Sequence, residues 1–125
     1  MTNWPSGGES DIYEGVNNAG DNHYAFHTLN GCVQTGEYQT GSIDTSNCYN
    51  NAAGQSAGAG CGGWGAANSY GTSMNNVGGG VYALDWRNEG IRIWYFQRGS
   101  VPSDILNNNP TTANWGTVSF RLEMD

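Results

Sequence analysis

Polar and apolar residues alternate in several short segments of the chain, as they do in strands with one buried face. Residues Glu9 to Glu14 (ESDIYE) alternate at their start and have glycines on both sides. Residues His23 to Thr28 (HYAFHT) alternate again and are followed by the turn pair Asn30-Gly31. Because successive side chains of a strand point to opposite faces, each segment predicts a short β-strand.

A longer pair of strands is predicted in the second half of the chain. Gly80 to Trp86 (GVYALDW) and Ile91 to Gln97 (IRIWYFQ) flank residues 87–90, which predicts an antiparallel hairpin with a four-residue loop. The second of these strands is largely apolar on both faces, so we expect both faces to be covered. A polar loop follows, and a last short strand is predicted from Thr117 to Leu122.

The segment from Asn50 to Gly80 has a different composition. It consists mostly of Gly, Ala, Ser and Asn, which cannot form a packed core of their own. We therefore expect a long surface excursion there. The whole chain has 20 glycines and 12% aromatic residues, a composition that favours an all-β fold over long helices.

Length and charge exclude several classes of protein. The 125 residues suffice for one domain with one core. The net charge is −7, with 4 arginines as the only basic residues besides histidine, which argues against nucleic acid as a partner. The chain has neither an apolar run that could span a membrane nor a signal-peptide pattern. We expect a monomer that binds neither nucleic acid nor a membrane.

The three cysteines, Cys32, Cys48 and Cys61, bear on the compartment. Their spacing contains no C-x-x-C pair, so no zinc site is expected. An odd number in an acidic, loop-rich chain fits an extracellular protein with one disulfide, the third cysteine being free or paired outside this chain. The alternative is three unpaired, small, buried residues.

Three carboxylates gather in the first predicted strand. In a regular strand Glu9 and Asp11 share a face and Glu14 points away. One β-bulge between Asp11 and Glu14 would put all three on one face, and bulges are frequent beside active sites. Two carboxyl groups roughly 5 to 5.5 Å apart are typical of a retaining glycosidase, with Glu9 as nucleophile and Glu14 as acid/base.

Carboxylates this close cannot all ionise at their ordinary pKa values. We expect one shared proton, and a raised pKa at Glu14 that suits this residue to protonate a leaving oxygen. A hydrogen bond from Asp11 is expected to orient Glu9. The competing interpretation is three solvated acids on an exposed edge.

The segment WPSGGESDIYEG, residues 4–15, resembles the signature of glycoside hydrolase family 16, and in particular its fungal, laminarinase-like endo-1,3(4)-β-glucanases. The resemblance continues in HTLNGC at His27–Cys32, GGVYALDW at Gly79–Trp86, GIRIWYF at Gly90–Phe96 and SVPSDI at Ser100–Ile105. It implies a β-jelly-roll (concanavalin A-like) sandwich whose concave sheet forms a sugar cleft. It also implies retaining hydrolysis of β-1,3 or mixed β-1,3-1,4 glucans without metal or cofactor, in a secreted or cell-wall protein.

By this resemblance Glu9 is the nucleophile, Asp11 its modulator and Glu14 the acid/base. Trp4 matches a family tryptophan that stacks on glucose beside the scissile bond, with packing before Pro5 as its alternative role. His27 matches a histidine near the acid/base, and a purely structural role stays open for it. Three further tryptophans are expected to fill the core rather than to bind sugar: Trp86, Trp94 and Trp115.

The chain also departs from the family. Ser10 replaces an apolar residue on the face opposite the acids, which should lower stability rather than affect chemistry. Family members are considerably longer, and residues Val118 to Asp125 diverge from their continuation. We therefore expect residues 1–125 to be a partial catalytic domain, a sandwich incomplete at both ends, impaired in turnover and unstable when isolated. A transglycosylase of this fold would share every site residue, whereas non-catalytic β-glucan-binding modules typically lose one or both glutamates.

Overall fold

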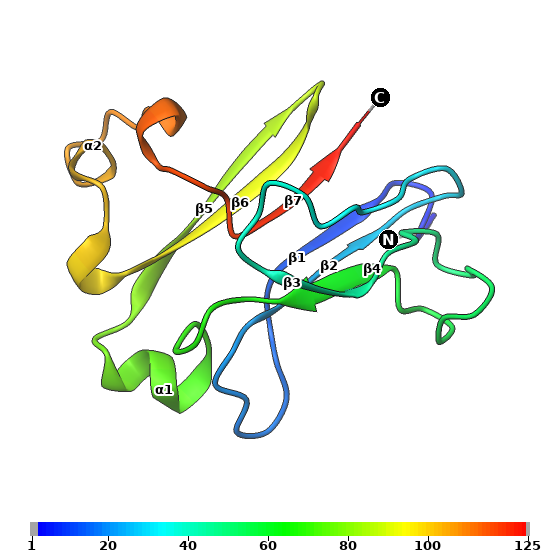
Figure 1. Ribbon diagram of the computed structural model, residues 1–125, viewed down its shortest axis with the longest axis horizontal. Helices are drawn as coiled ribbons and strands as arrows, with labels where there is room; N and C mark the ends of the chain where they lie inside the picture. The colour runs from blue at the N-terminus through cyan, green and yellow to red at the C-terminus, as the bar shows by residue number, and fades with distance from the viewer. Residues whose placement is uncertain (1–2, 125) are drawn as a thin grey trace.

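The computed structural model describes residues 3–124 of the chain (Figure 1). Strands dominate it, and both α-helices are short, as the composition predicts. The elements in chain order are β1 (Glu9–Glu14), β2 (His23–His27), β3 (Ser42–Thr45), β4 (Cys61–Trp64), α1 (Gly71–Asn76), β5 (Gly80–Arg87), β6 (Gly90–Gln97), the 3-10 turn Arg98–Ser100, α2 (Ser103–Leu106), the 3-10 turn Thr112–Asn114, and β7 (Phe120–Glu123).

The described strands form two antiparallel sheets. One has the strand order β1-β2-β4-β3 and the other the order β5-β6-β7. Figure 1 shows them as two layers, with β7 beside the first sheet and the hairpin of β5 and β6 reaching away from it. The all-β expectation is confirmed.

Aromatic rings from both sheets form the core between the layers. Tyr24 and Phe26 project from β2 on the side away from the two histidines of that strand, and both are buried. Phe120 of β7 stacks on both rings, at 5.2 Å from Tyr24 and 5.6 Å from Phe26. Ile91 and Ile93 of β6 belong to the same buried cluster. Burying such large apolar side chains is the main force that holds the two sheets together.

The hairpin of β5 and β6 lies where the sequence predicted it, but its turn is shorter than predicted. β5 and β6 pair residue for residue from Gly80↔Gln97 to Arg87↔Gly90, so only residues 88 and 89 form the loop. The predicted four-residue loop is therefore wrong. Gly90 has φ 152°, a conformation that a glycine adopts readily, and this lets the ladder extend one pair further.

Both faces of β6 are covered, as predicted. Ile93 is buried between the sheets, and Trp94 on the opposite face is only 4% exposed. The cover on that outer face is the segment 98–116, because Trp115 meets the Trp94 ring edge-on at 5.1 Å. Trp86 is a correction to the expected core tryptophans, since it lies 64% exposed on β5.

The glycine-rich segment 50–80 is not a surface excursion throughout. It contains β4, which is a central strand of the first sheet, and the short helix α1. Glycine is required in β4, since a Cβ at Gly63 would lie 1.8 Å from the carbonyl oxygen of Ser42 and 2.9 Å from the Phe120 ring. The hydrophobic pattern missed this strand because close backbone packing, and not apolar side chains, places it in the core.

Other boundaries also shift. β2 ends at His27, one residue before the predicted end, and Thr28 forms a single bridge with Tyr49. β3 was not predicted, because its four residues show no pattern that separates them from a loop. The last strand starts at Phe120 instead of Thr117. Its residues Phe120 and Leu122 are core residues, so the divergent tail contributes a strand to the second sheet.

The cysteines form one disulfide, between Cys48 and Cys61, and Cys32 is free and partly buried. One disulfide with a free thiol was among the expected arrangements, and the alternative of three unpaired cysteines is wrong. The bond joins β4 to the segment that precedes the loop 49–60.

A cluster of tyrosines joins the two sheets near α1. The ring of Tyr82 on β5 lies 4.8 Å from Tyr95 and 5.4 Å from Tyr13 of β1, and Tyr13 lies 4.6 Å from Tyr70. Burial raises the pKa of the phenols of Tyr82, Tyr95 and Tyr24 above the ordinary value. Within residues 3–124, neither helix has the length and apolar character needed to cross a bilayer.

Candidate active site

A β-bulge in β1 sets the geometry of the three carboxylates. Glu9 pairs with His27 and Asp11 with Ala25, whereas Glu14 pairs with His23, so β1 has one residue more than β2 between Asp11 and Glu14. The extra residue reverses the parity of Glu14. The three acids therefore share one face of the sheet, as the sequence spacing predicted.

A buried amide holds this bulge in place. Asn22, fully buried just before β2, donates from Nδ2 to the carbonyl of Ile12 at 2.9 Å and accepts from the backbone N–H of Glu14 at 2.9 Å. Its own N–H donates to Oγ of Ser69 at 2.8 Å. The amide thus satisfies the two backbone groups that the bulge removes from the strand ladder. Sequence analysis did not single out Asn22, since an asparagine in a turn-rich stretch is unremarkable.

His27 connects Asp11 to the loop 49–60. Its Nε2 lies 3.0 Å from Oδ2 of Asp11, and its Nδ1 lies 3.1 Å from Oδ1 of Asn50. A Cβ at Gly60 would lie 2.8 Å from the His27 ring, so this glycine makes room for the imidazole. Both ring nitrogens are engaged, which fixes the orientation of His27 beside Asp11.

Trp4 lies at the other end of the same carboxylate row. Its indole N–H donates to Oε2 of Glu9, and its ring centroid is 5.8 Å from that of His27. The side chain is 44% exposed, so one part of the ring faces solvent while its N–H holds the carboxylate. Donor atoms of Glu9, Asp11 and His27 lie within 4.8 Å of one another, but Trp4 and His27 already supply hydrogen bonds to the two acids.

Electrostatics single out Asp11 among the acids. Desolvation raises its pKa, repulsion from Glu9 and then Glu14 raises it further, and His27 opposes these effects by its positive charge and hydrogen bond. Asp11 is partly buried and lies between the two glutamates along β1, which explains why its pKa is raised, and the raised pKa expected at Glu14 stays a prediction. The expected hydrogen bond from Asp11 to Glu9 is not formed among the described residues, since Asp11 pairs with His27 instead.

Ser10 lies on the opposite face of β1, toward the core, as predicted. It pairs with Phe26, and its hydroxyl is buried without a hydrogen-bond partner in the described structure. The side chain lines an apolar cavity of about 150 Å³ together with Phe26, Ile91 and Leu122. Such a hydroxyl lowers stability and leaves the carboxylate face untouched.

An open hollow adjoins Glu14 on the side away from Glu9. It measures about 260 Å³ and is lined by Glu14, Gly15, Val16, His23 and Trp64. His23 and Trp64 pair across β2 and β4, and their rings meet edge-on at 4.7 Å. Sequence analysis missed these two residues, because only the strand register brings β4 beside the carboxylates.

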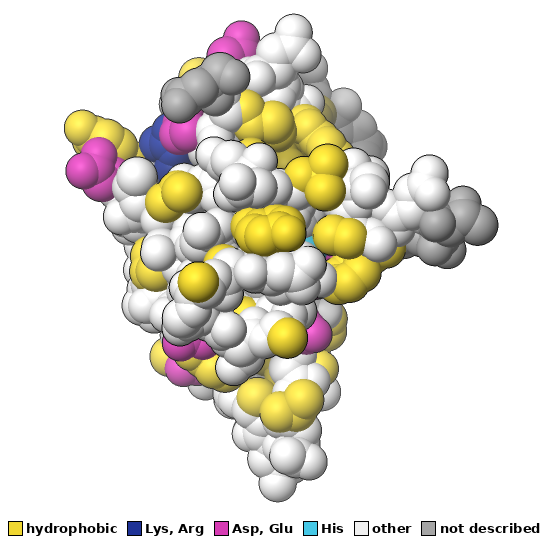
Figure 2. All heavy atoms as spheres, turned by 90° about the vertical axis from the view of Figure 1, so that its right-hand side faces the viewer, with side chains coloured by type: hydrophobic (Ala, Val, Ile, Leu, Met, Phe, Trp, Pro, Cys, Tyr) yellow, Lys and Arg dark blue, Asp and Glu magenta, His cyan; other side chains and the backbone are white. Residues whose placement is uncertain are grey.

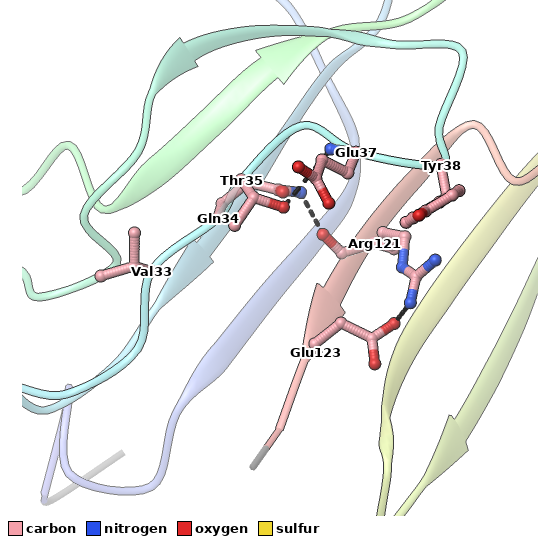
Figure 3. A pocket seen from close by; sticks show the side chains of 7 residues that line it. All are labelled: Val33, Gln34, Thr35, Glu37, Tyr38, Arg121 and Glu123. Carbon is pink, nitrogen blue, oxygen red and sulfur yellow. Dashed lines mark hydrogen bonds and ion pairs between the residues drawn. The ribbon is translucent and has the colours of Figure 1, made fainter.

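A second, larger cavity lies away from the carboxylates, between the loop 33–38 and β7 (Figure 3). It measures about 350 Å³, and its arginine is paired: Arg121 forms an ion pair with Glu123 and lies over the Tyr38 ring, while Glu37 also belongs to the lining. Gln34 donates to the carbonyl of Arg121. The pairing engages Arg121, the one basic residue of this lining, so the cavity offers no unpaired cation to a ligand.

The surface is poor in basic groups. Figure 2 shows the right-hand side of Figure 1, where hydrophobic and uncharged polar side chains predominate, with a histidine visible between hydrophobic groups near the centre. Lys and Arg atoms occupy one small patch of this face. A surface of this kind suits a neutral, hydroxyl-rich ligand better than a phosphate backbone.

Comparison with known proteins agrees with this geometry. A family model described as the XgeA-like catalytic GH16 domain matches residues 1–124. The chain belongs to glycoside hydrolase family 16. Family 16 relatives include an endo-1,3(4)-beta-glucanase of Arthroderma benhamiae, 41% identical over 120 residues, which are 93% of this chain and 26% of that protein. A probable glycosidase of Schizosaccharomyces pombe is 45% identical over 115 residues, 90% of this chain and 27% of that protein.

Solved family 16 structures share the fold closely. An elongating beta-1,3-glucosyltransferase has a TM-score of 0.86 and 35% identity, covering 100% of this chain and 41% of its own. Laminarinase 16A of Phanerochaete chrysosporium, solved with two beta-glucans, has a TM-score of 0.86 and 39% identity, covering 98% of this chain and 42% of its own. The two sheets are therefore part of a family 16 jelly roll, and the chain spans about a quarter of the length of the two relatives named above.

Proposed function

We propose that this chain carries the catalytic centre of a retaining endo-β-glucanase that cleaves β-1,3 or mixed β-1,3-1,4 glucans. The observation that carries the proposal is the bulge, which brings Glu9, Asp11 and Glu14 to one face beside His27 and Trp4. A row of solvated acids would not require a buried amide to reverse the parity of one of them.

Each residue has a distinct role in the proposed reaction. Glu9 attacks the anomeric carbon of the glucosyl unit, and the hydrogen bond from Trp4 fixes the attacking carboxylate. Glu14 protonates the glycosidic oxygen as the bond breaks, and then takes a proton from the incoming water that hydrolyses the glycosyl-enzyme. Asp11, whose raised pKa favours its protonated form, reduces the repulsion between the glutamates, and His27 keeps it in position.

Replacing the two glutamates one at a time tests these roles. In the longest natural chain that carries residues 1–125, Glu9→Gln should abolish formation of the glycosyl-enzyme, because no nucleophile is left. Glu14→Gln should lose laminarin hydrolysis and retain cleavage of aryl β-glucosides with acidic leaving groups, which need little protonation. Mass spectrometry of trapped enzyme and initial rates are the measurements.

The stereochemistry and a control variant complete this test. NMR of the first product should show the β-anomer, and the inverted α-anomer would contradict retention. Trp86→Ala, an exposed change on β5, is the matched control and should hydrolyse laminarin like wild type. Cleavage of aryl substrates by Glu9→Gln and not by Glu14→Gln would reverse the two roles.

Glucosyl transfer is a second candidate, favoured by the likeness to the elongating beta-1,3-glucosyltransferase. The same carboxylates serve both reactions, since transfer differs only in the acceptor that attacks the glycosyl-enzyme. Incubation with laminari-oligosaccharides at increasing concentration separates the two, because a transferase yields products longer than its substrate.

We also propose where the protein acts and what it binds. The disulfide between Cys48 and Cys61 supports a secreted or cell-wall location, where such bonds persist. A β-glucan is the proposed partner, and the protein acts as a monomer. Since the chain covers 41–42% of the solved relatives, we expect residues 1–125 alone to bind and cleave glucan poorly and to be only weakly stable.

A further inference from the structure

We propose that the hollow beside Glu14 binds the glucosyl unit that leaves with the glycosidic oxygen, and that Trp64 is its platform. This inference rests on the proposed function and adds a binding site with named residues. The hollow includes Glu14 and excludes Glu9, Trp4 and His27. A group that protonates the leaving oxygen must touch the sugar that departs, so the hollow lies on the leaving side of the bond.

The register of the sheet places Trp64 at a suitable distance. Glu14 pairs with His23, and His23 pairs with Trp64 in the next strand. Because adjacent strands are about 4.8 Å apart, the Cα atoms of Glu14 and Trp64 are separated by about 10 Å. His23 stands between them on the same face, so a sugar ring can lie over the His23 side chain and reach both the carboxylate and the indole.

The environment of Trp64 favours a sugar ring over a purely apolar ligand. Its side chain is 44% exposed, in contrast to the buried Trp94. The His23 ring packs against the indole in an edge-on arrangement, and His23 Nε2 lies 3.6 Å from a carboxylate oxygen of Asp44. An open aromatic surface with imidazole and carboxylate groups at its border fits a ring that has C–H faces and hydroxyls at its rim.

The glycine at position 62 supports the same arrangement. A Cβ there would lie 2.7 Å from the His23 ring, so only glycine lets the imidazole rest against β4 beside Trp64. The glycine-rich composition of this segment thus has a use at the site, since it lets two side chains of neighbouring strands form one platform.

The variant Trp64→Ala tests the site in the longest natural chain that carries residues 1–125. Two substrates are compared: a laminari-oligosaccharide, whose leaving group is a sugar, and an aryl β-laminaribioside, whose leaving group is a nitrophenol. We expect the ratio of kcat/KM for the first to that for the second to fall about tenfold, equivalent to about 1.4 kcal/mol. Trp64→Phe should recover most of this ratio, and Trp86→Ala should leave it at the wild-type value.

Other outcomes overturn the assignment. An equal loss on both substrates would place Trp64 on the other side of the bond or in a structural role, and an unchanged ratio would mean that no sugar stacks on it. Laminaribiose titration of Glu9→Gln against the double variant Glu9→Gln/Trp64→Ala, followed by fluorescence, tests binding without turnover. If wild type cleaves neither substrate, the proposed function fails, while this titration still decides whether the hollow binds sugar.

Discussion

The strands β1 and β6 were both predicted from the sequence, and they differ in regularity. β1 is an edge strand that pairs with β2, whereas β6 lies between β5 and β7, and all these pairs are antiparallel. β6 pairs with β5 through eight consecutive residues without a shift, and its side chains fill the core and its outer cover. β1 pairs with β2 and slips by one residue after Asp11.

This difference separates two uses of a strand. Regular pairing alternates side chains strictly between faces, which serves packing on both sides of β6. The slip in β1 puts three like charges on one face, an arrangement that costs free energy and requires the buried Asn22 to hold it. The irregular strand is therefore the one that carries the proposed chemistry, and the experiments below disturb this irregularity or change residues that lie on β1 or support it.

Inserting an alanine after Ile12 should have the largest effect. If the bulge is kept, the additional residue turns Glu14 to the opposite face, and if β1 pairs regularly instead, Glu14 moves away from its position opposite His23. Loss of a general acid lowers turnover by about 10²- to 10⁴-fold, measured as laminarin hydrolysis. Tyr13→Ala is the control, because it removes the ring contacts that the insertion disturbs and keeps the residue count, so it should retain most activity. Equal activity in the two variants would show that the bulge does not position Glu14.

Asn22→Ala should weaken both stability and turnover. It leaves the N–H of Glu14 and the carbonyl of Ile12 without their partner, and each such buried group costs about 1–3 kcal/mol. Thermal unfolding and kcat are the measurements. Gln34→Ala removes another buried amide with several hydrogen bonds, far from the carboxylates. It should lower the midpoint of unfolding while kcat of the folded enzyme stays at the wild-type value.

Ser10→Ile should raise stability by about 1–2 kcal/mol, since it removes an unpaired buried hydroxyl and adds apolar surface beside a cavity. The change faces away from the acids, so kcat should remain as in wild type. Ser10→Ala separates the two contributions, because it removes the hydroxyl without filling the cavity. A lower unfolding midpoint for Ser10→Ile would mean that the cavity cannot accept the side chain.

Asp11→Asn should have the smallest effect on stability and a characteristic pH dependence. The raised pKa means that folding disfavours the ionised form of Asp11, so this carboxyl is most compatible with the fold below its unfolded pKa near 3.8. The free-energy penalty that Asp11 imposes on folding grows as the pH rises from the unfolded pKa to the folded pKa, and it is constant above that range. The stabilisation of Asp11→Asn relative to wild type should therefore appear above about pH 4, and a gain confined to lower pH would contradict the raised pKa.

Sequence predicted the strands whose pattern depends on side chains. β1, β2, β5 and β6 were found because their apolar residues alternate or fill both faces. β4 was missed, because glycines place it in the sheet by allowing backbone contact, and glycine leaves no mark in a hydrophobic pattern. The turn at residues 88 and 89 was also missed, since the extra pair depends on the backbone conformation of Gly90.

Only part of the candidate site could be predicted, because only part of it leaves a pattern in the sequence. A spacing of five between Glu9 and Glu14 conflicts with a shared face, and this conflict alone predicted the bulge. Asn22 and Trp64 could not be found from the sequence. Asn22 acts by hydrogen bonding the backbone of β1, and Trp64 comes near Glu14 only through the register of β1, β2 and β4. The pKa of Asp11 is raised for a geometric reason, since this carboxyl is partly buried and lies between the two glutamates along β1.

Three tyrosines with raised pKa values lie between or beside the two sheets, and their absorbance can be used to follow unfolding of the protein. The raised pKa values of Tyr24, Tyr82 and Tyr95 mean that these phenols stabilise the fold up to about pH 10, and that this contribution is lost as alkalinity increases through their folded pKa values. Tyrosinate absorbs near 295 nm, whereas the neutral phenol does not. In alkali, absorbance from these rings should therefore rise together with separation of the sheets, as one cooperative step later than the titration of exposed tyrosines.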